Sequence, residues 1–385
     1  MREVDPAVLA RLRAGLSGPD AVTADVVAAA AREAGVVLGH ESLLAAVDTL
    51  HAELHGAGPL ESLLADPEVT DVLVNGPGSV WVDRGGGVER VRVDVGGESE
   101  LRALAARLAA AAGRRLDDAA PFVDARLAGG VRLHVVLPPL VAGGTHICLR
   151  VPSRRALALA DLDRLGAVPS GWAQVLERLV AARLAFVVSG GTGAGKTTVL
   201  GALLALVPAH ERIVLVEDCA EVRIEHPHVV RLEARTANVE GRGAVTLTDL
   251  VRQALRMRPD RIVVGEVRGA EVRELLTALN TGHEGGCGTV HANAAHEVPA
   301  RFEALGSLAG LDRAAVHSQM AGAIQVVLHL RRTGPLRRLV QIGVVATDGE
   351  LVRVLPALLA DPTDARAPGT RGPGWAALAD RLTLS

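Results

Sequence analysis

The sequence predicts an α/β protein in which a parallel-sheet domain follows a smaller α+β domain and an N-terminal helical extension. After residue 177, short apolar β-rich runs alternate with helical stretches, which is typical of a buried parallel sheet with helices on both faces. Before residue 151, short strand patterns are separated by glycine-rich turns. The expected divisions are a helical region (1–56), an α+β domain (57–151), a linker (152–176), the parallel-sheet domain (177–358) and a flexible tail (359–385).

The smaller domain is expected from mixed periodicity. Apolar residues recur at helical spacing in some stretches and alternate with polar residues in others. These patterns predict helices at 24–33, 43–54 and 98–112, and strands at 71–75, 80–83, 88–93 and 131–137.

The larger domain is expected from a repeated order of strand and helix. The pattern predicts strands at 184–189, 212–217, 261–265 and 288–291, a helix starting at 196, and helices at 248–257, 270–279, 297–308 and 312–323. Runs at 324–330 and 339–345 predict two added antiparallel strands. The proline- and glycine-rich run at 361–374 indicates a mobile tail.

The composition excludes several classes of protein. Apolar residues make up 49% of the 385 residues, which is enough for folded cores and excludes wholesale disorder. The net charge is −3, and the aromatic residues are three Trp and three Phe with no Tyr. A protein whose main task is direct binding of nucleic acid needs more positive charge and more stacking side chains, so we expect no direct nucleic-acid contact.

The cysteines and the apolar runs favour a cytoplasmic protein. Cys148, Cys219 and Cys287 are odd in number and too scattered for a disulfide framework, which favours a reducing compartment. The N-terminus lacks the apolar core of a signal peptide, and no run of 18 apolar residues occurs. We therefore expect any contact with a membrane to be peripheral or through a partner.

A phosphate-binding loop follows the first strand of the larger domain. The run 190–197 fits the pattern G-x-x-x-x-G-K-[ST], with a predicted strand before it and a predicted helix after it. Its glycines let backbone N–H groups converge on phosphate oxygens at the start of a helix. Lys196 can place its ammonium on the β- and γ-phosphates, and Thr197 can bind Mg²⁺. The expected nucleotide-binding residues are Gly190, Gly191, Thr192, Gly193, Ala194, Gly195, Lys196, Thr197 and Thr198.

Lys196 is the single lysine in the chain, beside 40 arginines. A compositional bias that has replaced almost every lysine has left this one in the loop. A compact, flexible ammonium fits inside a phosphate-binding loop, whereas a guanidinium is planar and bulkier. The position of the single lysine therefore supports the nucleotide-binding interpretation.

Two acidic residues at predicted strand ends are candidates for catalysis. Glu266 follows the apolar run 261–265, and its carboxylate could orient or polarise an attacking water. Glu217 ends the strand at 212–217 and is the candidate for a contact with Mg²⁺ or its water shell. Acids at strand ends are also common for purely structural reasons. The phosphate-binding loop upstream favours the catalytic interpretation.

Two interpretations are open for His291. His283, Cys287 and His291 recur at every fourth position, which on a helix would suggest a metal site. The glycines among them and the strand-like run 288–291 disfavour a helix. The alternative is that His291 lies at a strand end and contacts the γ-phosphate.

Four motifs, in their order along the chain, make the sequence resemble the motor ATPases of the type II/type IV secretion superfamily. They are GGTGAGKTT (190–198), VEDCAE (216–221), VGEVRG (264–269) and GTVHAN (288–293). The resemblance covers roughly residues 25–350. The GEVRG segment and the run PHVVRLEAR (227–235) make the chain most similar to the CpaF/TadA branch, which powers tight-adherence (Flp) pili.

The resemblance implies a RecA-like ATPase domain that uses ATP and Mg²⁺. The residues that match the family's positions are Lys196 and Thr197 (phosphates and Mg²⁺), Glu217 (acidic box), Glu266 (Walker B) and His291 (His box). The family places arginine fingers in the N-terminal domain, where they act on the charge of the transition-state phosphate. The matching candidates here are Arg126, Arg132 and Arg150.

The resemblance also implies a function. It is that of a Mg²⁺-dependent ATPase motor, a homo-oligomeric and hexameric ring that works on an inner-membrane platform protein in pilus assembly or protein secretion. Such a motor lies in the cytoplasm, peripheral to the inner face of the cytoplasmic membrane. Two alternatives stay open: a conjugation-type DNA-transfer ATPase, and a nucleotide-gated assembly protein that binds ATP without productive hydrolysis.

Overall fold

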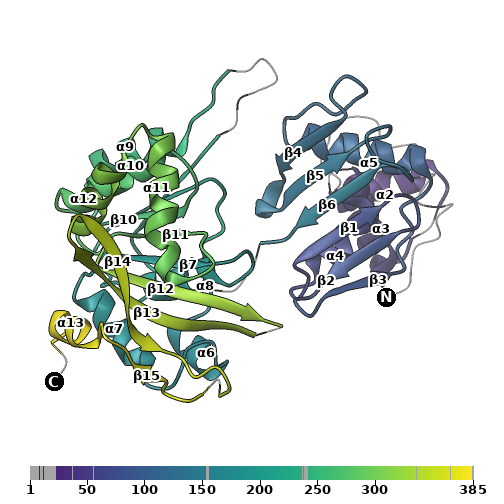
Figure 1. The fold of residues 1–385 in the computed structure, drawn as a ribbon. Helices are drawn as coiled ribbons and strands as arrows, with labels where there is room; N and C mark the ends of the chain where they lie inside the picture. The colour runs from purple at the N-terminus through teal and green to yellow at the C-terminus, as the bar shows by residue number, and fades with distance from the viewer. Residues whose placement is uncertain are drawn as a thin grey trace. The chain divides into compact units, whose positions relative to one another are not determined.

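The computed structural model divides the chain into two compact units, Met1–Pro152 and Ser153–Ser385 (Figure 1). The residues that the structure describes are 8, 12, 23–36, 38–54, 56–152, 156–235, 237, 242–334, 336–364 and 366–383. Most of residues 1–22, the start of the expected helical region, therefore lies outside the described residues, as does the start of the expected linker at 153–155.

Two helices open the described part of the first unit. α2 (Ala24–Glu33) and α3 (His40–Leu54) confirm the helices that the sequence predicts there. The hydroxyl of Thr23 accepts a hydrogen bond from the backbone N–H of Val26 and so caps the start of α2. Apolar side chains of the two helices form a small core of their own, which includes Val27 and Leu50.

A six-stranded antiparallel sheet forms the centre of the first unit, in the order β3-β2-β1-β6-β5-β4. Alternate side chains, such as Val72 and Leu133, point to one face and pack with α5 (Glu98–Ala111) in a buried core. The strands are β1 (Asp71–Asn75), β2 (Val80–Asp83), β3 (Val88–Val91), β4 (Phe122–Arg126), β5 (Arg132–Val136) and β6 (His146–Arg150).

A nine-stranded sheet forms the centre of the second unit, in the order β15-β14-β13-β12-β7-β11-β10-β8-β9. The six strands from β12 to β9 are parallel, which confirms the predicted parallel sheet. The parallel strands are β7 (Phe186–Gly190), β8 (Ile213–Glu217), β9 (Val229–Glu233), β10 (Arg261–Val267), β11 (Cys287–Val290) and β12 (Val326–Thr333). The antiparallel strands are β13 (Leu336–Asp348), β14 (Leu351–Leu359) and β15 (Thr370–Arg371).

Helices cover both faces of this sheet, as the sequence predicts. Side chains of β7 alternate between two cores, with Phe186 and Val188 in one and Val187 in the other. The first core is shared with α6 (Leu159–Arg164), α7 (Trp172–Ala181), α8 (Lys196–Leu204) and α13 (Trp375–Arg381). The second is shared with α9 (Leu247–Ala254), α10 (Glu271–Asn280), α11 (Val298–Leu308) and α12 (Arg313–Ala323).

The direction of β12 differs from the expectation. The sequence predicts an antiparallel strand at 324–330, but β12 pairs in parallel with β7. The helices α11 and α12 stand between β11 and β12 in the chain, and such a crossover returns the chain to the same end of the sheet. From β12 onward the direction alternates, because β13, β14 and β15 are each joined to the preceding strand by an antiparallel pairing.

Some described residues of the expected flexible tail (359–385) and of the expected linker (152–176) are instead packed into the core of the second unit. Trp172, within the expected linker, is 2% exposed, and its indole N–H donates to the carbonyl of Pro368 (2.7 Å). Leu378 of α13 is fully buried in the same core. The proline- and glycine-rich composition hides these few apolar anchors, which hold the surrounding turns against the sheet.

Candidate nucleotide-binding site

The loop between β7 and α8 has the backbone shape of a phosphate-binding loop. Gly190 (φ +154°), Gly193 (φ +69°) and Gly195 (φ +90°) adopt positive φ values that side chains other than glycine rarely take. A Cβ atom on Gly190 would also lie 2.6 Å from the carbonyl oxygen of Leu330 in β12. Glycine is therefore required here both for the turn and for the close approach of the next strand.

Lys196 is the first residue of α8 and is only 7% exposed although it carries a charge. Its Nζ donates hydrogen bonds to the carbonyls of Gly190 and Gly191 (3.1 and 3.0 Å) and lies 3.4 Å from both ring nitrogens of His291. Burial lowers the pKa of Lys196, and the charge of Glu266 opposes this shift. A phosphate at this point would supply the negative charge that a buried ammonium requires.

The other loop residues line the surface around Lys196. Gly191, Thr192 and Gly193 are exposed, and Ala194 is buried. Thr197 and Thr198 lie in the first turn of α8, with Thr197 partly buried and Thr198 exposed.

Glu266 and His291 are in close contact beside Lys196. Nε2 of His291 is 2.6 Å from Oε1 of Glu266, and the guanidinium of Arg268 pairs with Oε2 of the same carboxylate. Burial opposes ionisation of Glu266, but the hydrogen bond and charge of Arg268, followed by the charges of His291 and Lys196, outweigh it and lower its pKa. Burial, followed by the charge of Lys196, lowers the pKa of His291. These directions favour a carboxylate on Glu266 and a neutral imidazole on His291.

An irregular register helps to aim Glu266. β10 and β11 pair regularly up to Val264, and the register shifts between Val264 and Val267. Such irregularities re-aim side chains beside functional sites. The shift falls on the segment that contains Glu266, at the carboxyl end of the strand.

Glu217 is placed differently from Glu266. It is 3% exposed, and its Oε1 accepts hydrogen bonds from the backbone N–H groups of Glu221 and Val222 (2.9 and 2.8 Å). Oε2 lies 3.4 Å from Nη1 of Arg231. Burial raises the pKa of Glu217, although these backbone hydrogen bonds and the charge of Arg231 oppose the shift. The carboxyl group of Glu217 thus holds the loop that follows β8.

Two further functional candidates, Glu221 and Arg268, were not found by examining the residues at strand ends. The charge of Glu221 acts on both Lys196 and Arg268, and Arg268 pairs with Glu266. Both residues lie inside the VEDCAE and VGEVRG segments. The signal that could have found them was their position within these segments, beyond the acid that ends each strand.

The three arginine candidates of the first unit lie in one row of its sheet. Arg126 of β4 is paired with Arg132 of β5, and Arg132 is paired with Arg150 of β6. Residues directly opposite one another in a sheet project from the same face. Nε of Arg150 also donates to Asp71 (3.0 Å) on the next strand. The first unit therefore brings the three guanidinium-bearing residues together on one face.

A cavity of about 560 Å³ borders the loop. Its lining includes Gly191 and Thr192 of the loop, His291, Glu297 directly before α11, and Arg301 within α11. Across the described ranges, no three His, Cys, Asp or Glu side chains gather to hold a metal ion by themselves. A metal here would need other ligands, and Thr197 with phosphate oxygens is the set that the loop offers.

Comparison with known proteins assigns the chain to a family. Residues 53–341 match the family described as Type II/IV secretion system protein. This chain belongs to that family. A Mycobacterium tuberculosis protein whose name refers to conjugal transfer is 58% identical to this family member over 316 residues, covering 80% of this chain and 90% of the relative. The type IV secretion system protein PtlH of Bordetella pertussis is 35% identical over 264 residues, with coverage of 61% and 76%.

One further relative and two solved structures are also similar to the chain. The conjugal transfer protein TrbB of Rhizobium radiobacter is 31% identical to this secretion-family member over 284 residues, covering 72% of this chain and 84% of the relative. The crystal structure of the pilus retraction motor PilT with bound ADP has a TM-score of 0.53 at 20% identity, covering 79% of this chain and 83% of that one. The Legionella pneumophila ATPase DotB has a TM-score of 0.51 at 18% identity, with coverage of 79% and 80%. These two structures share the α/β fold.

The secretion-family member has no helix, within the ranges described above, with the length and apolar character needed to cross a membrane.

Proposed function

We propose that this secretion-family member is an ATPase motor that hydrolyses ATP with Mg²⁺. The observation that carries the proposal is the buried Lys196 in a glycine loop, in contact with His291 and beside the ionised Glu266. A glycine loop alone binds phosphate, but a carboxylate and an imidazole beside the lysine supply groups that can act on an attacking water.

Each residue has a distinct task in this proposal. Lys196 binds the β- and γ-phosphates, and the backbone N–H groups of the loop hold their oxygens. Glu266 orients and polarises the attacking water, while His291 contacts the γ-phosphate. Arg268 keeps Glu266 ionised through its ion pair.

The loop fits a magnesium ion through Thr197, whose hydroxyl group lies in the first turn of α8. Two acids are proposed for the ion's water shell. The charge of Glu221 acts on Lys196, whereas Glu217 ends β8 and already accepts hydrogen bonds from the backbone of the following loop. When bound, Mg²⁺ neutralises charge that develops on the transferred phosphate. Arg126, Arg132 and Arg150 are the candidates for arginine fingers, within one subunit or across a homo-oligomeric ring.

The broader role is that of a hexameric motor for pilus assembly of the tight-adherence type or for protein secretion. It would act from the cytoplasm on a platform protein of the inner membrane. A second candidate, a conjugation-type DNA-transfer ATPase, is favoured by the names of the M. tuberculosis relative and of TrbB. Affinity purification from detergent-solubilised membranes separates the two: a pilus platform protein supports the first, and a relaxase complex supports the second.

The nucleotide proposal is tested with Lys196→Ala and Lys196→Arg. Both variants are expected to lose ATP binding and Mg²⁺-dependent hydrolysis, because alanine removes the charge and arginine is too bulky and planar for the loop. Phosphate release and calorimetric titration with ATP measure the two losses. If Lys196→Ala keeps Mg²⁺-dependent hydrolysis, the proposal fails. Binding without turnover in the wild-type protein would support the nucleotide-gated assembly protein instead.

A further inference from the structure

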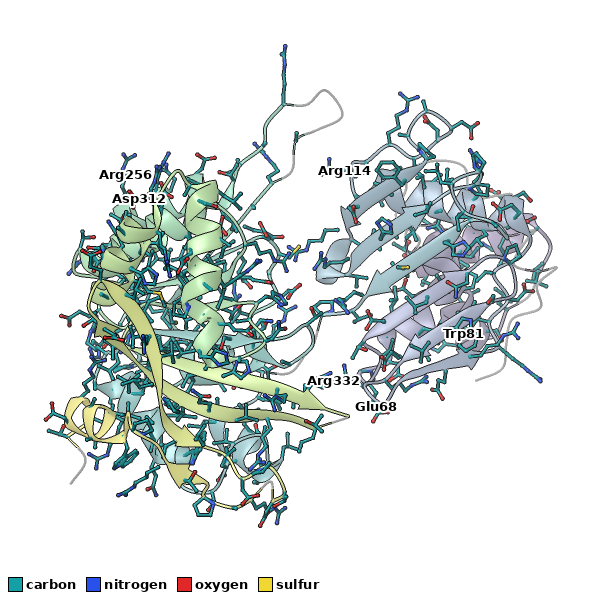
Figure 2. All side chains as sticks on the ribbon, viewed as in Figure 1. Glu68, Trp81, Arg114, Arg256, Asp312 and Arg332 are labelled. Carbon is teal, nitrogen blue, oxygen red and sulfur yellow. The ribbon has the colours of Figure 1, made fainter. Side chains whose placement is uncertain are left out.

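The β12–β13 hairpin brings two arginines to the phosphate-binding loop. Arg332 of β12 is paired directly with Arg337 of β13, so both side chains project from the same face of the hairpin. The two strands extend beyond the neighbouring strands of the sheet (Figure 1), and Arg332 lies near their end (Figure 2). β12 also borders β7, the strand that leads into the loop.

Both side chains reach glycines of the loop. Nη1 of Arg332 is 3.4 Å from the position that a Cβ atom on Gly193 would occupy. Cδ of Arg337 is 3.5 Å from the corresponding position at Gly195. The loop glycines that would cradle phosphate thus lie beside two arginine side chains, on the side of β7 that faces away from β11 and His291.

This pair of arginines is not balanced by negative charge. Both residues are exposed, and across the described residues neither guanidinium has an ion pair with a carboxylate. Within the described part of the chain, the one hydrogen bond from this pair runs from Nε of Arg332 to the carbonyl of Gly334 (3.0 Å). Like charges placed directly opposite on paired strands destabilise the pairing. A bound anion between them and the loop would remove this repulsion.

A neighbouring arginine shows the contrast. Arg338 also belongs to β13, but it is buried, and its two terminal nitrogens donate to the carbonyls of Asp361 and Asp364 (2.6 and 2.9 Å). That guanidinium is held by its own chain and has a structural task. Among the residues that the structure describes, Arg332 and Arg337 have no comparable set of partners.

We propose that Arg332 and Arg337 bind the phosphate chain of the nucleotide held by the loop. The inference rests on the nucleotide-binding function proposed above and adds a second group of ligands on the other side of β7. A guanidinium binds phosphate oxygens in a planar, bidentate manner, which a single point charge does not. Because these arginines stand apart from Glu266 and His291, they act on binding of ATP and ADP alike.

The test compares the nucleotide affinities of two variants of the full chain. Both variants are first checked to express and fold as the wild type does. In Arg332→Gln/Arg337→Gln, the affinity for ADP measured by calorimetric titration is expected to fall about tenfold or more, because two charge-assisted contacts are lost. Inorganic pyrophosphate should lose affinity to a similar degree. The matched control is Arg331→Gln, which removes a charge from the same hairpin but from its opposite face. Its affinity for ADP should stay within about twofold of the wild type.

The outcomes separate this inference from the proposed function. Unchanged ADP affinity in the double variant overturns the inference, and so does an equal loss in Arg331→Gln, which would show a general charge effect. Loss of ADP affinity with unchanged pyrophosphate affinity overturns the assignment to phosphate. If the double variant does not fold, Arg332→Lys should still show a smaller loss, because it keeps the charge without the bidentate contact. Wild-type protein that binds neither ADP nor ATP would overturn the proposed function itself.

Discussion

Strand β10 carries a charged residue near each end, and the two are held in opposite ways. Arg261 begins the strand at 1% exposure, and its guanidinium donates to Glu211 (2.7 Å) and to the carbonyl of Val180 (3.0 Å). Glu266, toward the other end, is partly buried and contacts His291 and Arg268 beside Lys196. At the first end, the charge of Arg261 is paired within the protein. At the second end, charged residues lie around a loop whose shape suits a bound ligand.

The difference follows from the direction of the strands. In a parallel sheet the carboxyl ends of all strands meet at one edge, and ligands bind there. Loops at that edge can carry the chemistry, because the strands below hold them in place. The amino ends of the strands do not bind the ligand, so charged groups buried there must be paired with other groups of the protein. A charged residue in one strand can therefore be structural or functional according to the end on which it lies.

The largest expected effect is a loss of ATP hydrolysis at the carboxyl end of β10, the functional end, where Glu266 lies. Glu266→Gln keeps the size of the side chain but removes the charge, so hydrolysis of ATP should fall by about 10²- to 10⁴-fold. Binding of ATP should persist, since Lys196 and the loop are unchanged. Phosphate release and calorimetric titration measure the two quantities. The exposed Glu350→Gln in the same unit is the control and should hydrolyse ATP normally. Turnover of Glu266→Gln at the wild-type rate would remove Glu266 from its role.

The next largest effect is expected at the amino end of β10, the structural end, where a substitution of Arg261 should lower the stability of the fold. Arg261→Met removes one partner of a buried ion pair and leaves Glu211 in a site of 7% exposure. The expected loss is about 3–5 kcal/mol in the free energy of unfolding, measured by denaturant titration. Glu211 keeps its contact with Arg183 (2.8 Å), which limits the loss. Nucleotide affinity of the folded fraction should be unchanged, and a selective loss of that affinity would break the comparison.

A smaller effect is expected at Gly286, which precedes β11 and lies against the structural end of β10. A Cβ atom there would lie 2.9 Å from the carbonyl oxygen of Ile262 and would also meet the side chain of Leu279. Gly286→Ala should therefore cost about 1–3 kcal/mol of stability through overpacking. Gly86→Ala is the control, since a Cβ atom at Gly86 meets nothing within 4 Å. Equal melting temperatures for the two variants would contradict the packing argument.

The sequence predicted the functional edge more fully than the structural one. Lys196, His291 and Glu266 follow strands whose apolar runs are visible in the sequence, so topology alone brings them together. Arg268 was missed because its importance depends on an ion pair, and side-chain pairing leaves no periodic signal. The buried pair of Arg261 and Glu211 was missed for the same reason, because the two residues are 50 positions apart.

Short segments were the other limit of prediction. β4 and β6 each turn only two apolar side chains inward, so their pattern is too brief to stand out, and pairing with β5 stabilises both. The C-terminal segment was expected to be mobile because proline and glycine dominate its composition. Trp375 packs against the core and Leu378 is buried in it, and this tertiary contact outweighs the local composition.

The smallest expected effect concerns His329, which lies at the functional end of the sheet but is buried at 3% exposure. Its Nδ1 is 2.9 Å from the hydroxyl of Ser189, the residue before the phosphate-binding loop. Burial, followed by the charge of Arg331, lowers the pKa of His329 below its ordinary value of 6.5, against the opposing effects of the Asn293 backbone and Glu297.

The sign of the pH dependence follows from that direction. Below pH 6.5 the unfolded chain binds a proton at this histidine more readily than the folded protein, so stability should fall as the pH decreases. His329→Gln should show a weaker decrease of melting temperature between pH 7.5 and 5.5 than the wild type. At pH 7.5 the variant should be less stable by on the order of 1 kcal/mol, the typical value of one buried hydrogen bond. An unchanged pH profile would contradict this role of His329 and would indicate that other titratable groups set the response.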